Sequence, residues 1–478
     1  MINIPTPWTA AGRATISRRE LLRGAGSAGA MGVVPSFLWG TQAPDLVLIL
    51  MADLHSGYAY TAALLQAVKS VISNSQNSRV VIVVNGDIFE SGNFLSSSTA
   101  VPGSIDLAML TQFGFLAPTI VTMGNHDGDI FDPTSFVSQV ASIYNVTLIS
   151  DLGNVRLSGS PLYTGNATTT FSVGNKQVKV TAIGTPSLGS YVQGAARYSV
   201  PNPGPYSASL FPSFYTPADF HLALVHAGFV QDTNVLPNLT APFLLHGAHD
   251  HLQFTQPLAG GQGLHIHAGY WSFGIATVGI NFGSSGVTMR PRQITLSRTS
   301  PVDTNLANLI TYSRATYLNS TNNPVLGQSS AEYDLDSAVQ LACGIVAAAA
   351  GADIGFLSHT TFGEGLPKGP VTKLDLNAFV RFPGGFSTAA ISGATLLQQV
   401  LPMTNQFGNF PYAQRTGDFL YSGVGPSNID PNKTYNCVVN AFAASSAYFG
   451  NPAPVFAAAD PSLELRTIVT QAIAAGKF

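Results

Sequence analysis

Apolar runs alternate with segments of helical spacing along the first half of the chain. Five near-continuous apolar runs are typical of strands that are covered on both faces. They are Leu46–Met51, Val80–Val84, Pro118–Val121, Leu222–Val225 and Pro242–Leu245. Thr61–Ile72 and Ser104–Phe113 repeat apolar residues at helical spacing, and the order strand, helix, strand predicts an α/β fold. Residues 146–216 predict short strands and loops, with an aromatic loop from Pro201 to Pro217.

Polar side chains follow each of the five runs, at the end where open α/β sheets bind ligands. They are Asp53 and His55, Asp87, Asn125, His226, and His249 with His251. Because alternate residues of an extended segment point the same way, Asp53 and His55 are expected to face one spot. Seven nitrogen and oxygen ligands without a thiolate suit two divalent ions such as Mn, Zn, Co or Fe. Two ions ~3.5–4 Å apart need a shared anion, and Asp87 is the natural bridge.

The stretch Thr122–Asp129 adds an acid–base pair to these ligands. His126 can exchange a proton near neutral pH, and Asp129 can hold its imidazole in one tautomer. Taken alone, the stretch could equally be a polar loop after a strand. The remaining histidines have no comparable placement and are interpreted as structural. They are His221, His246, His265, His267 and His359.

Length and composition favour a loop-rich globular protein of two or three domains. The chain has 478 residues, of which 9 % are charged, with 47 Gly and 30 Pro. A net charge of −3 without a Lys/Arg cluster argues against nucleic-acid binding. The two cysteines, Cys343 and Cys437, are predicted to be buried free thiols, with a disulfide between them as the alternative.

The N-terminus carries paired arginines before a mildly apolar run. Ser17-Arg18-Arg19-Glu20-Leu21-Leu22 precedes Gly24–Trp39, which resembles a bacterial twin-arginine signal. The segment therefore predicts a periplasmic or secreted protein that uses the twin-arginine export machinery. The alternative is a basic patch at the start of an ordinary helix. No later segment reaches the ~18 uninterrupted apolar residues of a membrane span.

The strand-end motifs together resemble the calcineurin-like metallophosphoesterases. The matching blocks are Asp53-x-His55, Gly86-Asp87, Gly124-Asn125-His126-Asp127, His226 and Gly247-x-His249-x-His251. The resemblance implies a four-layer αββα sandwich with one metal on Asp53, His55, Asp87 and His251. It implies a second metal on Asp87, Asn125, His226 and His249. It also implies that His126, paired with Asp129, stabilises the phosphoryl transition state.

The second half resembles the C-terminal domain of secreted 5′-nucleotidases, over Gly351–Ile354, Gly365–Thr372, Ile391–Ala394 and Asn440–Phe442. The resemblance implies an α+β substrate-binding domain in which Phe382 and Phe442 stack on the base. The alternative for both rings is core packing. The chain departs from the family pattern at three places, and these departures weaken the case for a plain nucleoside monophosphate as the substrate. The arginine expected at Gly363 is missing, Gln328–Ala342 contains no arginine, and Ser445–Tyr448 replaces a Gly-Gly-Asp-Gly stretch.

These observations predict four segments. They are a signal over 1–43, a metallophosphoesterase domain over 44–300, a linker helix over 301–325 and a 5′-nucleotidase-like domain over 326–478. The predicted activity is hydrolysis of a nucleotide or similar small phosphoester by a metal-activated hydroxide. One alternative is a non-catalytic exported binding protein on the same scaffold. The other is a hydrolase of a non-phosphate ester, such as a thiosulfohydrolase.

Overall fold

The computed structural model describes residues 43–90, 94–99, 101–130, 133–151, 156–157, 160–161, 166–186, 200–408, 412–415, 417–444, 449 and 454–478. The predicted signal segment with Arg18 and Arg19 lies outside these residues, as does the Ser445–Tyr448 stretch. Within them, no helix combines the length and apolar composition needed to cross a bilayer.

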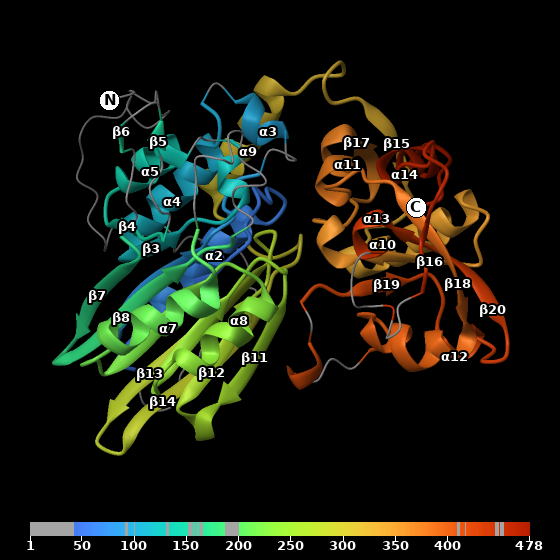
Figure 1. Ribbon diagram of the computed structural model, residues 1–478. Helices are drawn as coiled ribbons and strands as arrows, with labels where there is room; N and C mark the ends of the chain where they lie inside the picture. Colours follow the sequence, from blue (N-terminus) through green and yellow to red (C-terminus); the bar gives the residue numbers. More distant parts are fainter. Residues whose placement is uncertain are drawn as a thin grey trace.

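Two six-stranded mixed sheets form the N-terminal half (Figure 1). The first has the order β14-β13-β1-β2-β3-β4 and the second the order β11-β12-β10-β9-β8-β7. The strands of the first sheet are β1 (Leu46–Met51), β2 (Arg79–Asn85), β3 (Thr119–Thr122), β4 (Val146–Leu148), β13 (Gly274–Gly283) and β14 (Gly286–Thr295). Those of the second are β7 (Thr168–Val173), β8 (Lys176–Ile183), β9 (Phe220–Val225), β10 (Phe243–Gly247), β11 (Gln253–Leu258) and β12 (Gly263–Ala268). The five predicted strands become β1, β2, β3, β9 and β10, and each is parallel to its neighbours among these five.

The strands of the two sheets bury both of their faces, which explains their near-continuous apolar runs. Leu46 and Leu48 of β1 pack between the sheets, in one cluster with Leu222 and Leu244 of the second sheet. Val47 faces the opposite way, into a cluster with the helices that cover the first sheet. Those helices are α2 (Thr61–Ser73), α3 (Phe94–Ser98), α4 (Ser104–Leu116), α5 (Pro133–Ala141) and α9 (Thr304–Tyr317). The predicted α/β class is therefore confirmed.

The outer face of the second sheet is covered by α7 (Pro203–Phe214) and α8 (Phe229–Val235). The prediction of an aromatic loop from Pro201 to Pro217 is wrong, because most of this segment forms α7. Pro203 occupies the first turn, where a missing N–H costs nothing. Phe211 and Tyr215 then bury their rings against β9 and β10. Burial of these rings thus stabilises a helix in a segment whose composition is typical of a loop.

A separate α+β domain follows (Figure 1). Its five-stranded sheet has the order β19-β16-β20-β18-β21, beside a β15-β17 pair. The strands are β15 (Val325–Ser329), β16 (Ile354–Ser358), β17 (Gly369–Thr372), β18 (Phe386–Ser392), β19 (Leu420–Ser422), β20 (Thr434–Asn440) and β21 (Ala457–Ala458). The helices are α10 (Leu335–Ala349), α11 (Lys373–Phe379), α12 (Gly393–Thr395), α13 (Ala441–Ala444) and α14 (Leu465–Ala474). Cys343 and Cys437 are buried here as free thiols, as predicted, and burial raises the pKa of Cys437 to about 12.

Candidate metal centre and interdomain cavity

The loops after β1 and β2 are joined through their backbones. The N–H of Asp53 donates to the carbonyl of Gly86 at 3.1 Å, and that of His55 to the carbonyl of Asp87 at 2.9 Å. At the end of β2, the Asn85 side chain donates to the carbonyls of Val225 and His246 in the second sheet, at 3.2 and 2.8 Å. Backbone bonds therefore fix the loops that carry the predicted ligands.

Five of the predicted metal ligands have left-handed backbones. Their φ angles run from 49° to 86° at Asp53, His55, Asp87, His249 and His251. Few residues other than glycine adopt this region, and such strain persists where function requires the geometry. The extended backbone expected between Asp53 and His55 is therefore wrong, although both side chains still reach the same cluster.

Two glycines allow the loops to approach one another closely. A Cβ at Gly124 would lie 2.2 Å from Oδ1 of Asp87. One at Gly86, where φ is +74°, would lie 2.5 Å from Nδ1 of His226. Any larger residue would push the ligands apart, so the glycines of these motifs serve packing.

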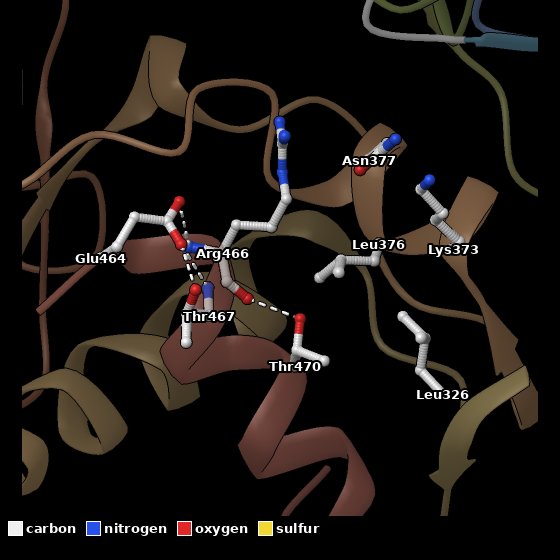
Figure 2. A pocket seen from close by; sticks show the side chains of 8 residues that line it. All are labelled: Leu326, Lys373, Leu376, Asn377, Glu464, Arg466, Thr467 and Thr470. Carbon is white, nitrogen blue, oxygen red and sulfur yellow. Dashed lines mark hydrogen bonds between the residues drawn. The ribbon is translucent and has the colours of Figure 1, made fainter. Parts of the chain in front are cut away.

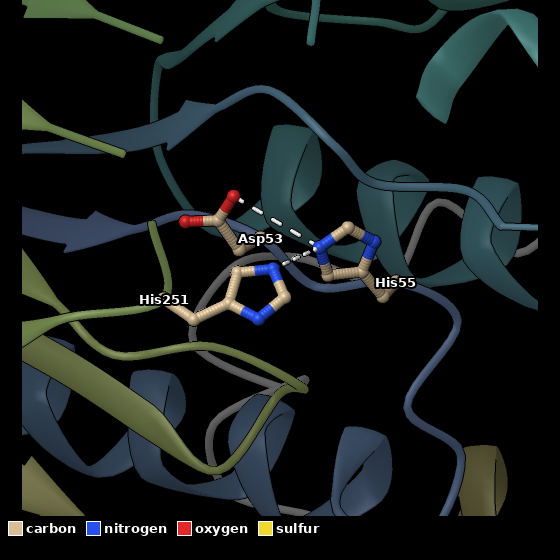
Figure 3. Close-up of side chains that lie close together, drawn as sticks. All are labelled: Asp53, His55 and His251. Atoms are coloured by element: carbon tan, nitrogen blue, oxygen red, sulfur yellow. Dashed lines mark hydrogen bonds and ion pairs between the residues drawn. The ribbon is translucent and has the colours of Figure 1, made fainter. Parts of the chain in front are cut away.

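The predicted ligands meet in two adjacent clusters. Asp53, His55 and His251 form one (Figure 3), with Nε2 of His55 2.9 Å from Nε2 of His251. Asp87, His226 and His249 form the other. Oδ2 of Asp87 lies 3.1 Å from Nε2 of His226 and 3.8 Å from Nε2 of His55. Asp87 thus lies between the clusters, where a bridging carboxylate is needed.

Two further contacts complete the second cluster. Oδ1 of Asn125 lies 2.8 Å from Nδ1 of His249. The carbonyl of Asn85 accepts a bond from Nδ1 of His226 at 2.7 Å, which leaves Nε2 of His226 for a ligand. All seven predicted ligands are therefore brought together.

Burial makes this donor set unfavourable without a cation. It raises the pKa of Asp53 to about 7 and lowers that of His249 to about 3. Desolvation disfavours the charged form of each group. A divalent cation requires a carboxylate and neutral imidazoles and would stabilise the carboxylate charge. The clusters therefore fit metal sites.

His126 lies beside the second cluster, in a short 3₁₀ turn (His126–Gly128). Its N–H donates to Oδ1 of Asp87 at 2.7 Å, and its Nδ1 lies 2.9 Å from Oδ2 of Asp129. Burial alone would lower the pKa of His126, but Glu90 and Asp129 outweigh it and raise that pKa. The ring lines the interdomain cavity described below, so it is placed to act on a ligand there.

Sequence reasoning missed two charged residues at the first cluster. Glu90, three residues after Asp87, lies 2.9 Å from Nδ1 of His55 and so orients that ring. Arg381 reaches Glu90 from the C-terminal domain, with contacts of 2.6 and 3.2 Å. Its guanidinium also lies 3.4 Å from Nε2 of His251. The spacing of Glu90 from Asp87 is a weak signal, and nothing in the sequence places Arg381 here.

A cavity of about 300 Å³ opens between the domains. It is lined by Asp87, Asn125, His126, His249 and His251 on one side, and by Thr360, Arg381, Phe382, Asn440 and Phe442 on the other. Phe382 and Phe442 are 39 % and 62 % exposed, so core packing does not explain them. The ring centre of Phe382 is 6.0 Å from that of His126.

A second, open groove of about 570 Å³ lies beside α11 and α14 (Figure 2), and no histidine or aspartate lines it.

The missing arginine at Gly363 has a steric cause. A Cβ there would lie 2.3 Å from the indole of Trp271, which is fully buried. The guanidinium of Arg381 lies over the same indole, 5.3 Å from its centre. This chain therefore brings positive charge to the cavity from position 381, because position 363 has no room for a side chain.

The other histidines lie outside these two clusters. His359 contacts the carbonyl of His251 through Nε2 at 3.0 Å, and so joins the domains. His221 stacks on Tyr215, with ring centres 4.2 Å apart. His246 is buried in β10. His265 and His267 meet Asp232 on the far face of the second sheet.

Comparison with known proteins assigns both halves of the molecule. The sequence model of the calcineurin-like phosphoesterase family matches residues 46–190. The model of the 5′-nucleotidase C-terminal domain matches residues 283–448. The chain joins a calcineurin-like phosphoesterase domain to a 5′-nucleotidase C-terminal domain. It thus has the scaffold of the metal-dependent 5′-nucleotidases.

Solved structures share this fold at low sequence identity. A 5′-nucleotidase precursor from Thermus thermophilus is 14 % identical over 90 % of this chain and 96 % of its own, with a TM-score of 0.55. A 5′-nucleotidase from Candida albicans is 12 % identical over 91 % and 99 %, with a TM-score of 0.56. The sulfate thiohydrolase SoxB of Thermus thermophilus is 13 % identical over 91 % and 94 %, with a TM-score of 0.55. A search of curated sequences gives no match. Identities this low establish the fold alone.

Proposed function

We propose that this protein is an exported hydrolase with a two-metal centre that removes phosphate from a nucleotide or a similar small phosphoester. The observation that carries the proposal is the pair of clusters sharing Asp87 in a cavity that also contains His126 and two exposed aromatic rings. Export is supported by the paired arginines Arg18 and Arg19 alone.

Each part of the cavity has a separate task. The first cluster with Asp87 would hold one divalent ion, and Asn125, His226 and His249 with Asp87 the other. Such a pair supplies an activated water and neutralises phosphoryl charge. His126, oriented by Asp129, donates a hydrogen bond or a proton to the phosphoryl oxygens. Arg381, held by Glu90, adds fixed positive charge at the same end.

The rings of Phe382 and Phe442 favour a substrate with a flat group. Stacking tolerates any base, whereas charged hydrogen bonds give selectivity. Because the arginine expected at Gly363 is absent, we propose a broad enzyme with little preference among bases.

Assays on the same purified protein also test the two alternative functions. A non-catalytic binding protein has no physical need for seven matched ligands, five of them on left-handed backbones. A thiosulfohydrolase draws support from the likeness to SoxB, which concerns the fold. The purified protein should therefore be assayed with mono-, di- and cyclic nucleotides, an aryl phosphate and an S-thiosulfonate ester. Phosphate release that His126→Ala slows strongly supports the proposal, and sulfate release alone contradicts it. Fewer than one metal equivalent without turnover would favour the binding protein.

The role of Phe442 can be separated from that of Phe382. Stacking is worth ~1–3 kcal/mol, so Phe442→Ala should raise KM for a nucleotide roughly 5–100-fold. It should leave a small aryl phosphate nearly unaffected. Phe382→Ala is the matched control, because the proximity of Phe382 to His126 means that both substrates should lose affinity. Equal losses for both substrates in Phe442→Ala would contradict the stacking role.

A further inference from the structure

A third group of metal-type ligands lies outside the interdomain cavity. His265 and His267 are alternate residues of β12 and point from the same face of the second sheet. Asp232 of α8 lies against them, with Oδ2 3.0 Å from Nε2 of His265 and 2.7 Å from Nε2 of His267. All three side chains are at most 1 % exposed. This Asp232 cluster serves no purpose in the proposed hydrolysis.

The Asp232 cluster resembles the catalytic clusters in its spacing. Ligand atoms of the catalytic clusters are separated by 2.9 Å between His55 and His251 and by 3.1 Å between Asp87 and His226. The separations in the Asp232 cluster, 2.7 and 3.0 Å, are similar. Two imidazoles and a carboxylate also form a donor set that zinc accepts.

Hydrogen bonding within the Asp232 cluster leaves buried polar atoms unpaired. Both imidazoles converge on the same oxygen, Oδ2, while Oδ1 of Asp232 has no partner among the described residues. Nδ1 of His267 has none either. Buried polar atoms normally have partners, so this unpaired carboxylate oxygen needs an explanation, and a cation is one that fits its two imidazole neighbours.

We propose that Asp232, His265 and His267 hold a third divalent cation, with zinc as the best fit, in a structural site. Oδ2 of Asp232 and the two Nε2 atoms provide three donors that lie close together, and the unpaired Oδ1 of Asp232 is available as a fourth. Nδ1 of His265 lies 2.8 Å from the hydroxyl of Tyr412, a contact that would orient the ring as outer partners of metal ligands do.

The position of the Asp232 cluster indicates what the ion stabilises. A Cβ at Gly247, the last residue of β10, would lie 2.1 Å from Nε2 of His267 and 2.2 Å from Oδ2 of Asp232. The chain continues directly from Gly247 to His249 and His251. The ion would therefore join α8 and β12 around the strand whose end carries two catalytic ligands. Full burial of the cluster favours a permanently held structural ion over an exchangeable catalytic one.

Metal counting on the full chain tests the proposal. Protein saturated with zinc and then dialysed should hold three equivalents, by elemental analysis. The double variant His265→Gln/His267→Gln should hold two, with a lower melting temperature. His221→Gln is the matched control: it removes another buried histidine of the same sheet and should still hold three. An anomalous difference map at the zinc edge should show a peak beside Asp232.

Two results would overturn the third site. One is an unaltered protein with two equivalents and anomalous peaks only at the catalytic clusters, which would make the Asp232 cluster a hydrogen-bonded network. The other is a double variant that keeps three equivalents. If the double variant does not fold, the anomalous map of the unaltered protein decides. Failure of the catalytic assignment is distinguishable, because Asp87→Ala would then leave the metal content unchanged.

Discussion

Replacing Arg381 with methionine should uncouple the two domains. The guanidinium contacts both oxygens of Glu90, at 2.6 and 3.2 Å, across the domain boundary. Arg381 is 4 % exposed and Glu90 is 2 % exposed. Burial alone would raise the pKa of Glu90, but Arg381 and His126 hold it well below its usual value. The variant keeps the length of the side chain and leaves a buried carboxylate without its cation.

The structure sets the size of the effect. Breaking a buried ion pair by removing one partner costs about 3–5 kcal/mol, and burial at these positions leaves little solvent screening. Because Glu90 and Arg381 belong to different domains, water can reach Glu90 if the domains separate. At 1.4 kcal/mol per factor of ten, the equilibrium should shift roughly 140- to 3700-fold towards separated domains.

Small-angle X-ray scattering on the purified variant should show a larger radius of gyration, and kcat/KM should fall because the cavity is split. The double variant Glu90→Gln/Arg381→Met removes the unpaired charge and should recover much of the compact form. Lys69→Met is the control within one domain, since it breaks the 2.6 Å contact of Lys69 with Asp303. It should leave the scattering unchanged. The reasoning would be refuted if Arg381→Met had the radius of gyration of the unaltered protein and a kcat/KM no lower than that of the double variant.

Three further predictions concern the metal centre and export. Asp87→Ala removes the carboxylate between the clusters and should cost at least one metal equivalent and nearly all turnover; two retained metals with normal turnover would exclude the bridging role. His126→Ala should lower kcat by roughly 10²–10⁴ while the metals stay bound, with a smaller loss for Asp129→Asn. Loss of metal in His126→Ala would instead make His126 a ligand. Changing Arg18 and Arg19 to lysine keeps the charge but not the guanidinium geometry, so the protein should remain in the cytoplasm; cell fractionation that finds it exported would contradict the signal.

Most of the metal centre could be anticipated from local sequence. Each predicted ligand follows an apolar run, and parallel strands bring their ends to one edge of a sheet. The α/β class followed from the same runs. The roles of these residues and the domain limits at 44, 300 and 325 remain predictions.

Sequence patterns failed where distant contacts decide the structure. The segment over Pro201–Pro217 forms the helix α7 because Phe211 and Tyr215 find a buried surface on β9 and β10. Asp53 and His55 leave the extended conformation because their loop is bonded to that of Gly86 and Asp87. Neither partner surface is visible in the local pattern.

The sequence by itself determined five core strands, the seven candidate ligands and the pairing of His126 with Asp129, because these depend on periodicity and short spacings. Only the tertiary structure decided that Arg381 reaches Glu90 across 291 positions, and that Trp271 occupies the space of a side chain at Gly363. It also brought Asp232 to His265 and His267. Such contacts depend on how sheets, helices and domains pack, and packing is a property of the whole chain, which no local stretch encodes.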